Sequence, residues 1–221
     1  MIGSGCRNSP SSAGRTSLIL AAGAIALLGL GGCETGSSKG DFVDLFDGKS
    51  TKGWIKPFDW GKATVEDKAI LLHSDGKMFF LVTEKTYRDF VLEVEVLLPD
   101  NGNSGIQFRS HYKQNKLRGY QAEVDPSERR WSGGFYDEGR RGWLVNLKGK
   151  DKAQAAFKNG QWNHYRIEAV GDHIQIFVNG IQTVDTYDQE DSEGHIALQH
   201  HGEAGLVYRF RNVRIEELSP Q

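Results

Sequence analysis

Short segments in which apolar and polar residues alternate, each followed by turn-forming residues, are the feature that most constrains the fold of this chain. Residues 90–98 alternate in their middle and end at Pro99-Asp100-Asn101-Gly102. Residues 173–178 alternate and run into Asn179-Gly180, a dipeptide that favours the type I′ turn of a β-hairpin. Four further segments have the same character, at residues 106–109, 162–170, 195–199 and 210–218.

Helical periodicity is the competing pattern, and no segment sustains it. Residues 150–158 are at most a short helix or a loop. The chain contains 27 Gly against 5 Pro, which indicates many tight turns. Strands at this spacing predict an all-β domain in which two antiparallel sheets form a sandwich.

Length and charge limit the organisation and the partners. The 221 residues suit one domain, and no internal repeat or linker follows residue 40. The formal net charge is -2, and no stripe rich in Lys and Arg stands out, so nucleic acid is not an expected partner. Both cysteines, Cys6 and Cys33, precede the folded part, so no disulfide is expected within it.

The N-terminal residues 1–32 have the anatomy of a bacterial lipoprotein signal peptide. Arg7 and Arg15 precede an apolar run over residues 18–30, which is shorter than the roughly 20 apolar residues of a membrane-spanning helix. Leu30-Gly31-Gly32-Cys33 then matches the lipobox, so Cys33 is the expected lipidation site. The alternative is an ordinary signal peptide with an incidental cysteine.

This reading places the protein in the bacterial cell envelope. Residues 33–40 form a Gly/Ser-rich tether, and residues 41–221 form the domain. Acyl chains on Cys33 would hold the protein on a membrane, since each buried methylene contributes about 0.8 kcal/mol. The domain is then expected in the periplasm or at the outer membrane or cell surface.

Polar residues recur on one face of several expected strands. Gln107 and Arg109 share a face by alternation, as do Gln121, Glu123 and Asp125, and a third pair is Gln199 with His201. A solvated outer face explains any one of these residues. Carbohydrate sites also combine such polar groups with flat aromatic rings. Four rings in this chain suit that use: Trp54, Trp131, Tyr136 and Trp143.

Residues 123–128 contain the pattern E-x-D-x-x-E of laminarinase-like retaining glycoside hydrolases. In that reading Glu123 is the nucleophile and Glu128 the general acid, with carboxyl groups about 5–5.5 Å apart. Pro126 lacks the N–H that a central strand needs, so the chain is expected to turn before Glu128. Glu128 would then leave the face of Glu123.

No cofactor is required by the sequence. Glu, Asp and His side chains that converge on one face would allow a divalent metal, but no tight ligand spacing such as H-x-x-x-H occurs. The metal ligands therefore stay unassigned.

The domain as a whole resembles the 3-keto-disaccharide hydrolase domain family, a group of concanavalin-like jelly-roll proteins common among bacterial lipoproteins. The resemblance extends from residue 41 to residue 218. It rests on blocks that follow the family order: residues 42–50, 53–54, 89–92, 102–109, 119–125, 133–138, 140–143, 160–163, 178–180, 198–202 and 210–213.

The resemblance implies a jelly-roll sandwich of the concanavalin A-like lectin/glucanase type, and cleavage of glycosides whose sugar is already oxidised at C3. A ketone at C3 acidifies the hydrogen at C2, so a base removes it and the C1–O bond breaks by elimination. Water then adds to the enone, and the net result is hydrolysis. Such a site needs a base near C2 and a donor for the enolate oxygen.

The family motif positions supply candidates for these roles. The expected base is His201 or Glu123, and Arg109 is the expected stabiliser of the enolate oxygen. The expected substrate-binding residues are Gln107, Gln121, Asp125, Trp131, Tyr136, Glu138 and Arg141. In the competing structural readings, Arg109 pairs with Glu123 across neighbouring strands, and His201 orients the turn at Gly202.

Three functions stay open at the level of sequence. The first is cleavage of oxidised glycosides in the cell envelope, with a sugar 3-dehydrogenase as a partner in the same pathway. The second is a carbohydrate-binding lipoprotein without catalysis, suggested by the aromatic and basic residues between Arg129 and Trp143. The third is a conventional retaining glucanase that uses Glu123 and Glu128.

Overall fold

The computed structural model describes residues 41–219, which form two antiparallel sheets. The expected signal peptide, Cys33 and the expected tether lie outside the described residues. Sheet A runs in the order β13-β12-β11-β6-β15-β4-β3, and β1 also pairs with β15. Its strands are β1 (Val43–Asp44), β3 (Lys62–Glu66), β4 (Ala69–His73), β6 (Phe90–Leu97), β11 (Asn163–Val170), β12 (His173–Val178), β13 (Ile181–Tyr187) and β15 (Val207–Glu217).

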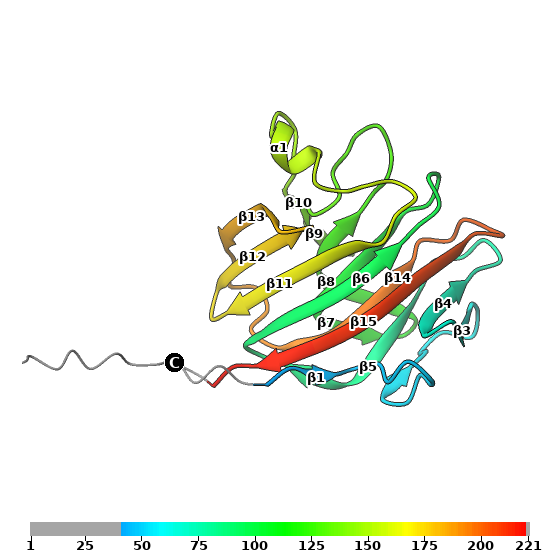
Figure 1. Cartoon of the computed structure of the whole chain (residues 1–221). Helices are drawn as coiled ribbons and strands as arrows, with labels where there is room; N and C mark the ends of the chain where they lie inside the picture. Colours follow the sequence, from blue (N-terminus) through cyan, green and yellow to red (C-terminus); the bar gives the residue numbers. More distant parts are fainter. Residues whose placement is uncertain (1–40, 220–221) are drawn as a thin grey trace, which may run out of the picture. The chain divides into compact units, whose positions relative to one another are not determined.

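Sheet B runs in the order β10-β9-β8-β7-β14-β5-β2. Its strands are β2 (Trp54–Ile55), β5 (Phe79–Tyr87), β7 (Ser104–Lys113), β8 (Lys116–Val124), β9 (Phe135–Glu138), β10 (Gly142–Val145) and β14 (Gly194–His200). The single described helix, α1 (Asp151–Gln154), lies at one end of the sandwich, next to β13 (Figure 1). The all-β fold of two antiparallel sheets is therefore confirmed.

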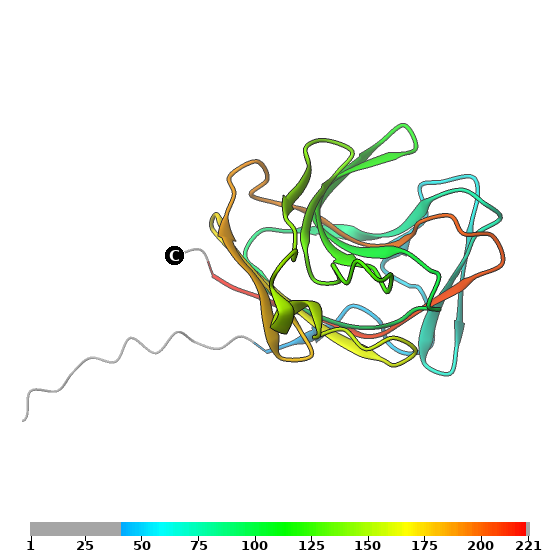
Figure 2. The same ribbon diagram turned by 90° about the horizontal axis from the view of Figure 1, so that it is seen from above.

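Alternation along the strands produces the core. Alternate residues of β7 and β8 point between the sheets, where Phe108 packs edge-on against Phe90 of sheet A with ring centroids 6.5 Å apart. Tyr165 on β11 reaches across the sandwich and donates its hydroxyl to the carbonyl oxygen of Glu123 on β8, at 3.0 Å. The two layers are seen from above in Figure 2.

The turn at Asn179 and Gly180 joins β12 and β13 into a hairpin, as the sequence predicts. Asn179 and Gly180 have φ values of 50° and 77°, as the hairpin between β12 and β13 requires. The helix over residues 151–154 is as short as expected, because nothing in that segment supplies an apolar helical stripe. No helix among residues 41–219 is long and apolar enough to cross a membrane.

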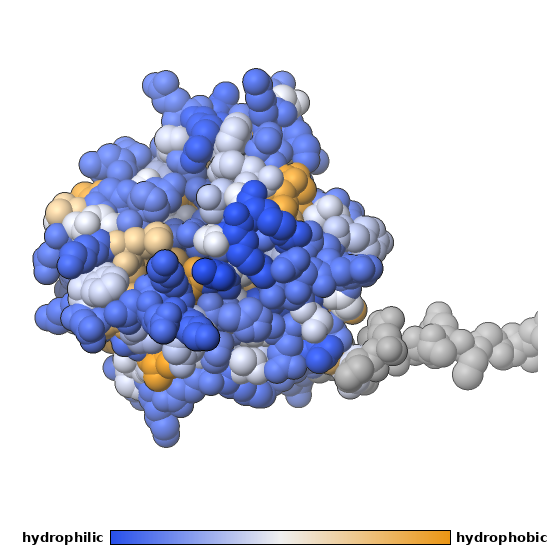
Figure 3. All heavy atoms as spheres, turned by 180° about the vertical axis from the view of Figure 1, so that it is seen from behind, coloured by the Kyte–Doolittle hydropathy of each residue, from blue (hydrophilic) through white to orange (hydrophobic). Residues whose placement is uncertain are grey.

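The surface seen from behind in Figure 3 is mostly hydrophilic, and its hydrophobic areas are small and separate. Few large apolar side chains are exposed in the described part of the chain: Val43, Met78, Tyr112 and Tyr187. Met78 is the one of these that lines the polar cavity described below.

Candidate functional site

A polar cavity of about 430 Å³ opens on the outer face of sheet B. Side chains of β8, β9, β10 and β14 meet there, together with residues of four connecting segments. Its lining consists of Met78, Asn103, Gln121, Glu123, Arg129, Tyr136, Glu138, Trp143, Gln199 and His201. The cavity thus combines carboxylates, amides, a cation and aromatic rings.

Strand register explains why these side chains converge. Gln121 on β8 lies opposite Tyr136 on β9, and Glu123 lies opposite Gly105 on β7. A Cβ at Gly105 would be only 2.2 Å from Cδ of Gln121, so glycine is what lets the Gln121 side chain lie over β7. The missing side chain creates the space in which the polar groups of β8 gather.

Glu123 lies at the end of a chain of amide hydrogen bonds. Gln107 donates to Oε1 of Gln121, and Gln121 in turn donates to Oε2 of Glu123 at 2.7 Å. Asn103 donates to Oε1 of Glu123 at 3.1 Å. The two amides orient the carboxylate and leave no freedom for it to rotate without losing a bond.

Burial decides the protonation of Glu123. Its side chain is only 6% exposed, and this loss of solvent raises the pKa of Glu123 to about 7, although the bonds from Asn103 and Gln121 favour the ionised form. The nearby charge of Asp125 raises the pKa further, and Arg129 opposes it from 3.9 Å. Glu123 is therefore poised to exchange a proton near neutral pH.

A second carboxyl group, Glu138, lies across the cavity at the end of β9. Burial raises its pKa, while the charge of His201 and a hydrogen bond from Gln199 oppose the shift. Gln199 Nε2 lies 3.4 Å from Glu138 Oε2, and the Oε1 atom of Gln199 is buried without a hydrogen-bond partner. An unpaired buried oxygen in a polar cavity is suited to accept a hydrogen bond from a ligand hydroxyl.

Arg129 supplies the positive charge at the rim of the cavity. Its guanidinium lies 4.8 Å from the ring centroid of Trp131 and 5.4 Å from that of Trp143, and its Nε donates to Oδ2 of Asp125 at 2.8 Å. These contacts hold the guanidinium next to Glu123.

Five of the residues predicted for the site line this cavity: Gln121, Glu123, Tyr136, Glu138 and His201. Gln107 lies beneath them and contacts Gln121. His201 is at the rim, half exposed, with Nδ1 2.8 Å from Glu203. The neighbouring His200 points to the other side and stacks on Tyr208, as expected for adjacent residues at a strand end.

Other predicted residues lie outside the lining but contact it. Asp125 and Trp131 both hold Arg129, so they act on the cavity through that side chain. Trp54 is buried and donates its Nε1 to the carbonyl of Leu45, which is a structural role.

Arg109 is the largest departure from expectation. Its side chain is fully buried and donates to the carbonyl oxygens of Arg88, Gly171 and Asp191 and to the carboxylate of Asp89. The register of β7 with β8 shifts between Phe108 and His111, and Arg109 has a φ of 46°. This bulge interrupts the alternation by which Arg109 and Gln107 were expected to share a face. The prediction that Arg109 belongs to the site was therefore wrong.

Arg141 is also held elsewhere. It pairs with Asp137 and forms two hydrogen bonds with Asp188, at 2.9 and 3.0 Å. Because both carboxylates lie away from the cavity lining, the prediction that Arg141 binds substrate in this cavity does not match its position.

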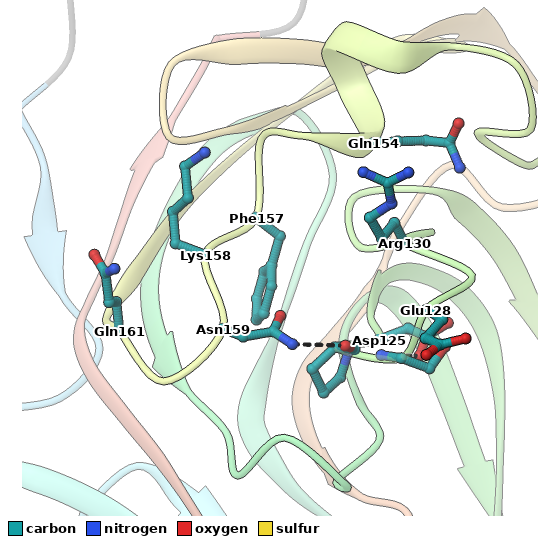
Figure 4. A pocket seen from close by; sticks show the side chains of 10 residues that line it. Asp125, Glu128, Arg130, Gln154, Phe157, Lys158, Asn159 and Gln161 are labelled. Atoms are coloured by element: carbon teal, nitrogen blue, oxygen red, sulfur yellow. Dashed lines mark hydrogen bonds between the residues drawn. The ribbon is translucent and has the colours of Figure 1, made fainter.

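Glu128 does not share the cavity with Glu123. Strand β8 ends at Val124, and the exposed Glu128 follows Pro126 in a loop, as the proline predicts. Figure 4 shows Glu128 at a separate cavity of about 330 Å³, together with Asp125, Arg130 and Phe157. The paired carboxylates of a retaining glucanase are thus not assembled by this motif.

Five lining residues are absent from the predicted catalytic and substrate-binding residues: Met78, Asn103, Arg129, Trp143 and Gln199. The sequence analysis names Gln199 only as part of a polar face, Trp143 only as a suitable ring, and Arg129 only as part of an aromatic and basic stretch. Gln199 had a usable signal, since it alternates with His201. Asn103 and Arg129 come from loops, whose direction no periodicity predicts. In the described part of the chain, no group of three or more His, Cys, Asp and Glu side chains is placed to hold a metal ion.

Comparison with solved structures supports the fold. A candidate glycosyl hydrolase from Parabacteroides distasonis is 18% identical, with a TM-score of 0.59, over 81% of this chain and 94% of that chain. The carbohydrate-binding module CBM66 from Bacillus subtilis is 23% identical, with a TM-score of 0.57, over 75% of this chain and 96% of that chain. A protein of unknown function with a galectin-like fold, also from Bacillus subtilis, is 12% identical, with a TM-score of 0.56, over 77% and 91% of the two chains.

A search of the curated proteins gives no match. A family model described as the 3-keto-alpha-glucoside-1,2-lyase-like domain matches residues 41–216, which is nearly the whole described domain. The chain therefore belongs to the family of 3-keto-alpha-glucoside-1,2-lyase-like domains.

Proposed function

We propose that this domain cleaves glycosides whose sugar carries a ketone at C3, by elimination followed by addition of water. The observation that carries the proposal is Glu123, a buried carboxyl group with a pKa of about 7, oriented by two amides in a polar cavity. A general base works best when its pKa lies near the operating pH. The family to which the chain belongs supports the same chemistry.

In the first step, ionised Glu123 takes the proton from C2 of the bound sugar. The electrons of the C2–H bond form the enolate, whose negative charge develops on the C3 oxygen. Arg129 lies 3.9 Å from Glu123 and acts as the cationic hydrogen-bond donor to that oxygen. Arg109 does not take this role, because its guanidinium is buried and already donates to other groups.

In the second step, the enolate collapses and the C1–O bond breaks. The departing aglycone oxygen takes a proton from Glu138, whose raised pKa keeps more of it protonated than an exposed glutamate. Water then adds at C1 of the enone and gives one of its protons to the ionised Glu138, while the proton held by Glu123 returns to C2. Atoms and charge balance, and the net reaction is hydrolysis.

Around these groups, the remaining lining binds the sugar. Tyr136 and Trp143 pack edge-to-face with ring centroids 5.2 Å apart and provide an aromatic wall. The unpaired Oε1 of Gln199 accepts from a sugar hydroxyl, and His201 contacts the sugar from the rim.

The test compares a chromogenic glucoside with its 3-keto derivative, each incubated with the purified protein with and without a divalent metal. Release of the aglycone from the keto compound alone is expected. Release from the unoxidised glucoside would contradict the elimination route, because C2 is not acidic without the ketone.

Binding without catalysis is the second candidate, favoured by one observation. The guanidinium of Arg129 and the rings of Trp131 and Trp143 form an aromatic and cationic cluster at the cavity rim, as a sugar-binding surface would. Tight sugar binding with no turnover of either compound would support it.

The proposed substrate requires a preceding oxidation at C3, so we propose that a sugar 3-dehydrogenase acts before this protein. We also propose that the chain works in the bacterial cell envelope, lipid-anchored through Cys33, as the N-terminal sequence pattern predicts.

A further inference from the structure

A second cavity, of about 320 Å³, adjoins the candidate site and differs from it in character. Its walls include Phe58, Phe80 and Leu117, all of which are buried. The rings of Phe58 and Phe80 lie with centroids 5.8 Å apart. Phe80 and Leu117 lie on β5 and β8 of sheet B, and Phe58 lies in the segment between β2 and β3. The rest of the lining is Met78, Asn115, Lys116, Arg118, Glu138 and Gly139.

Two residues, Met78 and Glu138, line both cavities. Met78 is 38% exposed, and its sulfur lies 3.4 Å from Nε2 of Gln199, which also faces Glu138 at 3.4 Å. In the register of β14 with β5, Gln199 lies directly opposite Phe80. The polar and the apolar cavity therefore meet at Met78 and Glu138.

Glu138 stands at the boundary where a glycosidic bond would be broken. A sugar held by the amides around Glu123, with its C1 toward Glu138, directs its aglycone past Met78 into the apolar cavity. The thioether of Met78 and the phenylalanine rings suit a flat apolar group rather than a second sugar, whose hydroxyls would lose water there without finding partners.

We propose that the apolar cavity is the aglycone subsite, and that the substrates of this chain are 3-keto-glycosides with an aromatic aglycone. This inference rests on the proposed function for the orientation of the sugar. The exposed Lys116 and Arg118 at the cavity edge leave room for polar substituents on the ring to stay in water.

The experiment compares the 3-keto forms of methyl and benzyl glucoside, because methanol and benzyl alcohol are similar leaving groups and differ mainly in apolar size. The wild-type protein is expected to show a kcat/KM for the benzyl compound about tenfold or more above that for the methyl compound. In Leu117→Ser this preference is expected to fall to near unity through KM, with the methyl compound turned over as by the wild type.

Tyr112→Ser is the matched control. Tyr112 pairs with Leu117 across the β7–β8 hairpin but packs on His195 outside the cavity, so this variant keeps the preference. Equal kcat/KM for both compounds in the wild type would overturn the proposal, as would an unchanged preference in Leu117→Ser.

Binding of the unoxidised methyl and benzyl glucosides, measured by calorimetry, separates this inference from the proposed function. If no 3-keto compound is turned over but the wild type binds the benzyl glucoside more tightly and Leu117→Ser does not, the subsite stands and the reaction fails. If turnover occurs without any benzyl preference in either measurement, the reaction stands and the aglycone subsite fails.

Discussion

At the scale of single residues, Glu123 controls the proposed reaction, and Glu123→Gln is expected to lower kcat/KM for a 3-keto-glucoside by about 10²–10⁴-fold. In the wild type the rate should rise with pH through about 7, since the base acts only when ionised. A pH series of kcat/KM measures both effects. The matched variant is Glu128→Gln, whose carboxyl group lies at the other cavity and whose loss should leave activity close to wild type. Loss of activity in Glu128→Gln on an unoxidised glucan would instead favour a retaining glucanase.

The same carboxyl group links stability to pH. Its pKa in the folded protein is about 7, above the ordinary value of 4.5, so the contribution of the protonated form to stability is full below pH 4.5 and is lost as pH rises through 7. We expect the free energy of unfolding to fall between pH 5 and pH 8 by up to ~3 kcal/mol from this group. Denaturant titrations of Glu123→Gln should lack this part of the slope, and an identical slope in the variant would contradict the raised pKa.

At the scale of elements, the bulge in β7 depends on Arg109. Its guanidinium satisfies three carbonyl oxygens and Asp89 at a fully buried position. Arg109→Met should lower the free energy of unfolding by about 3–5 kcal/mol, because it leaves these acceptors unpaired. Turnover per folded molecule is expected to persist at low temperature. The control is Arg88→Met at a neighbouring exposed arginine, which should change the melting temperature little. Loss of turnover without loss of stability would return Arg109 to a catalytic role.

The sequence predicts the secondary structure of this molecule better than it predicts the residues of the candidate site. Strand alternation and the Asn179-Gly180 turn were sufficient for the fold class and for strands within β6, β7, β11, β12, β14 and β15, because burial of one face leaves a period of two in the sequence. The strands β1 to β5, β9 and β10 were not predicted individually. The same period placed Gln121 and Glu123 together. It was wrong for Arg109, since a bulge adopted by a residue other than glycine has no local sequence signature. The period of two also could not predict the position of Arg129, because this residue reaches the cavity from a loop.

At the scale of the whole molecule, the two sheets have unlike outer faces. On sheet A, Glu93 is paired with Arg166 and Arg214, and Glu95 is paired with Arg211. Glu93 is buried beneath its two arginines, which are themselves partly exposed, so the carboxylates of this face already have cationic partners. The outer face of sheet B instead carries neutral amides around a buried carboxyl group. Only the second arrangement leaves polar atoms available to a ligand.

The N-terminal end of the domain enters sheet A, since β1 pairs with β15, whereas the cavity lies on the outer face of sheet B. We expect the full chain, produced in a bacterium that processes lipoproteins, to enter the detergent phase of a Triton X-114 separation, and Cys33→Ser to stay in the aqueous phase. Turnover of a small 3-keto-glucoside should be equal for both proteins. Partition of Cys33→Ser with the detergent would contradict lipidation at this residue, and a rise in turnover on losing Cys33 would mean that the anchor obstructs the cavity.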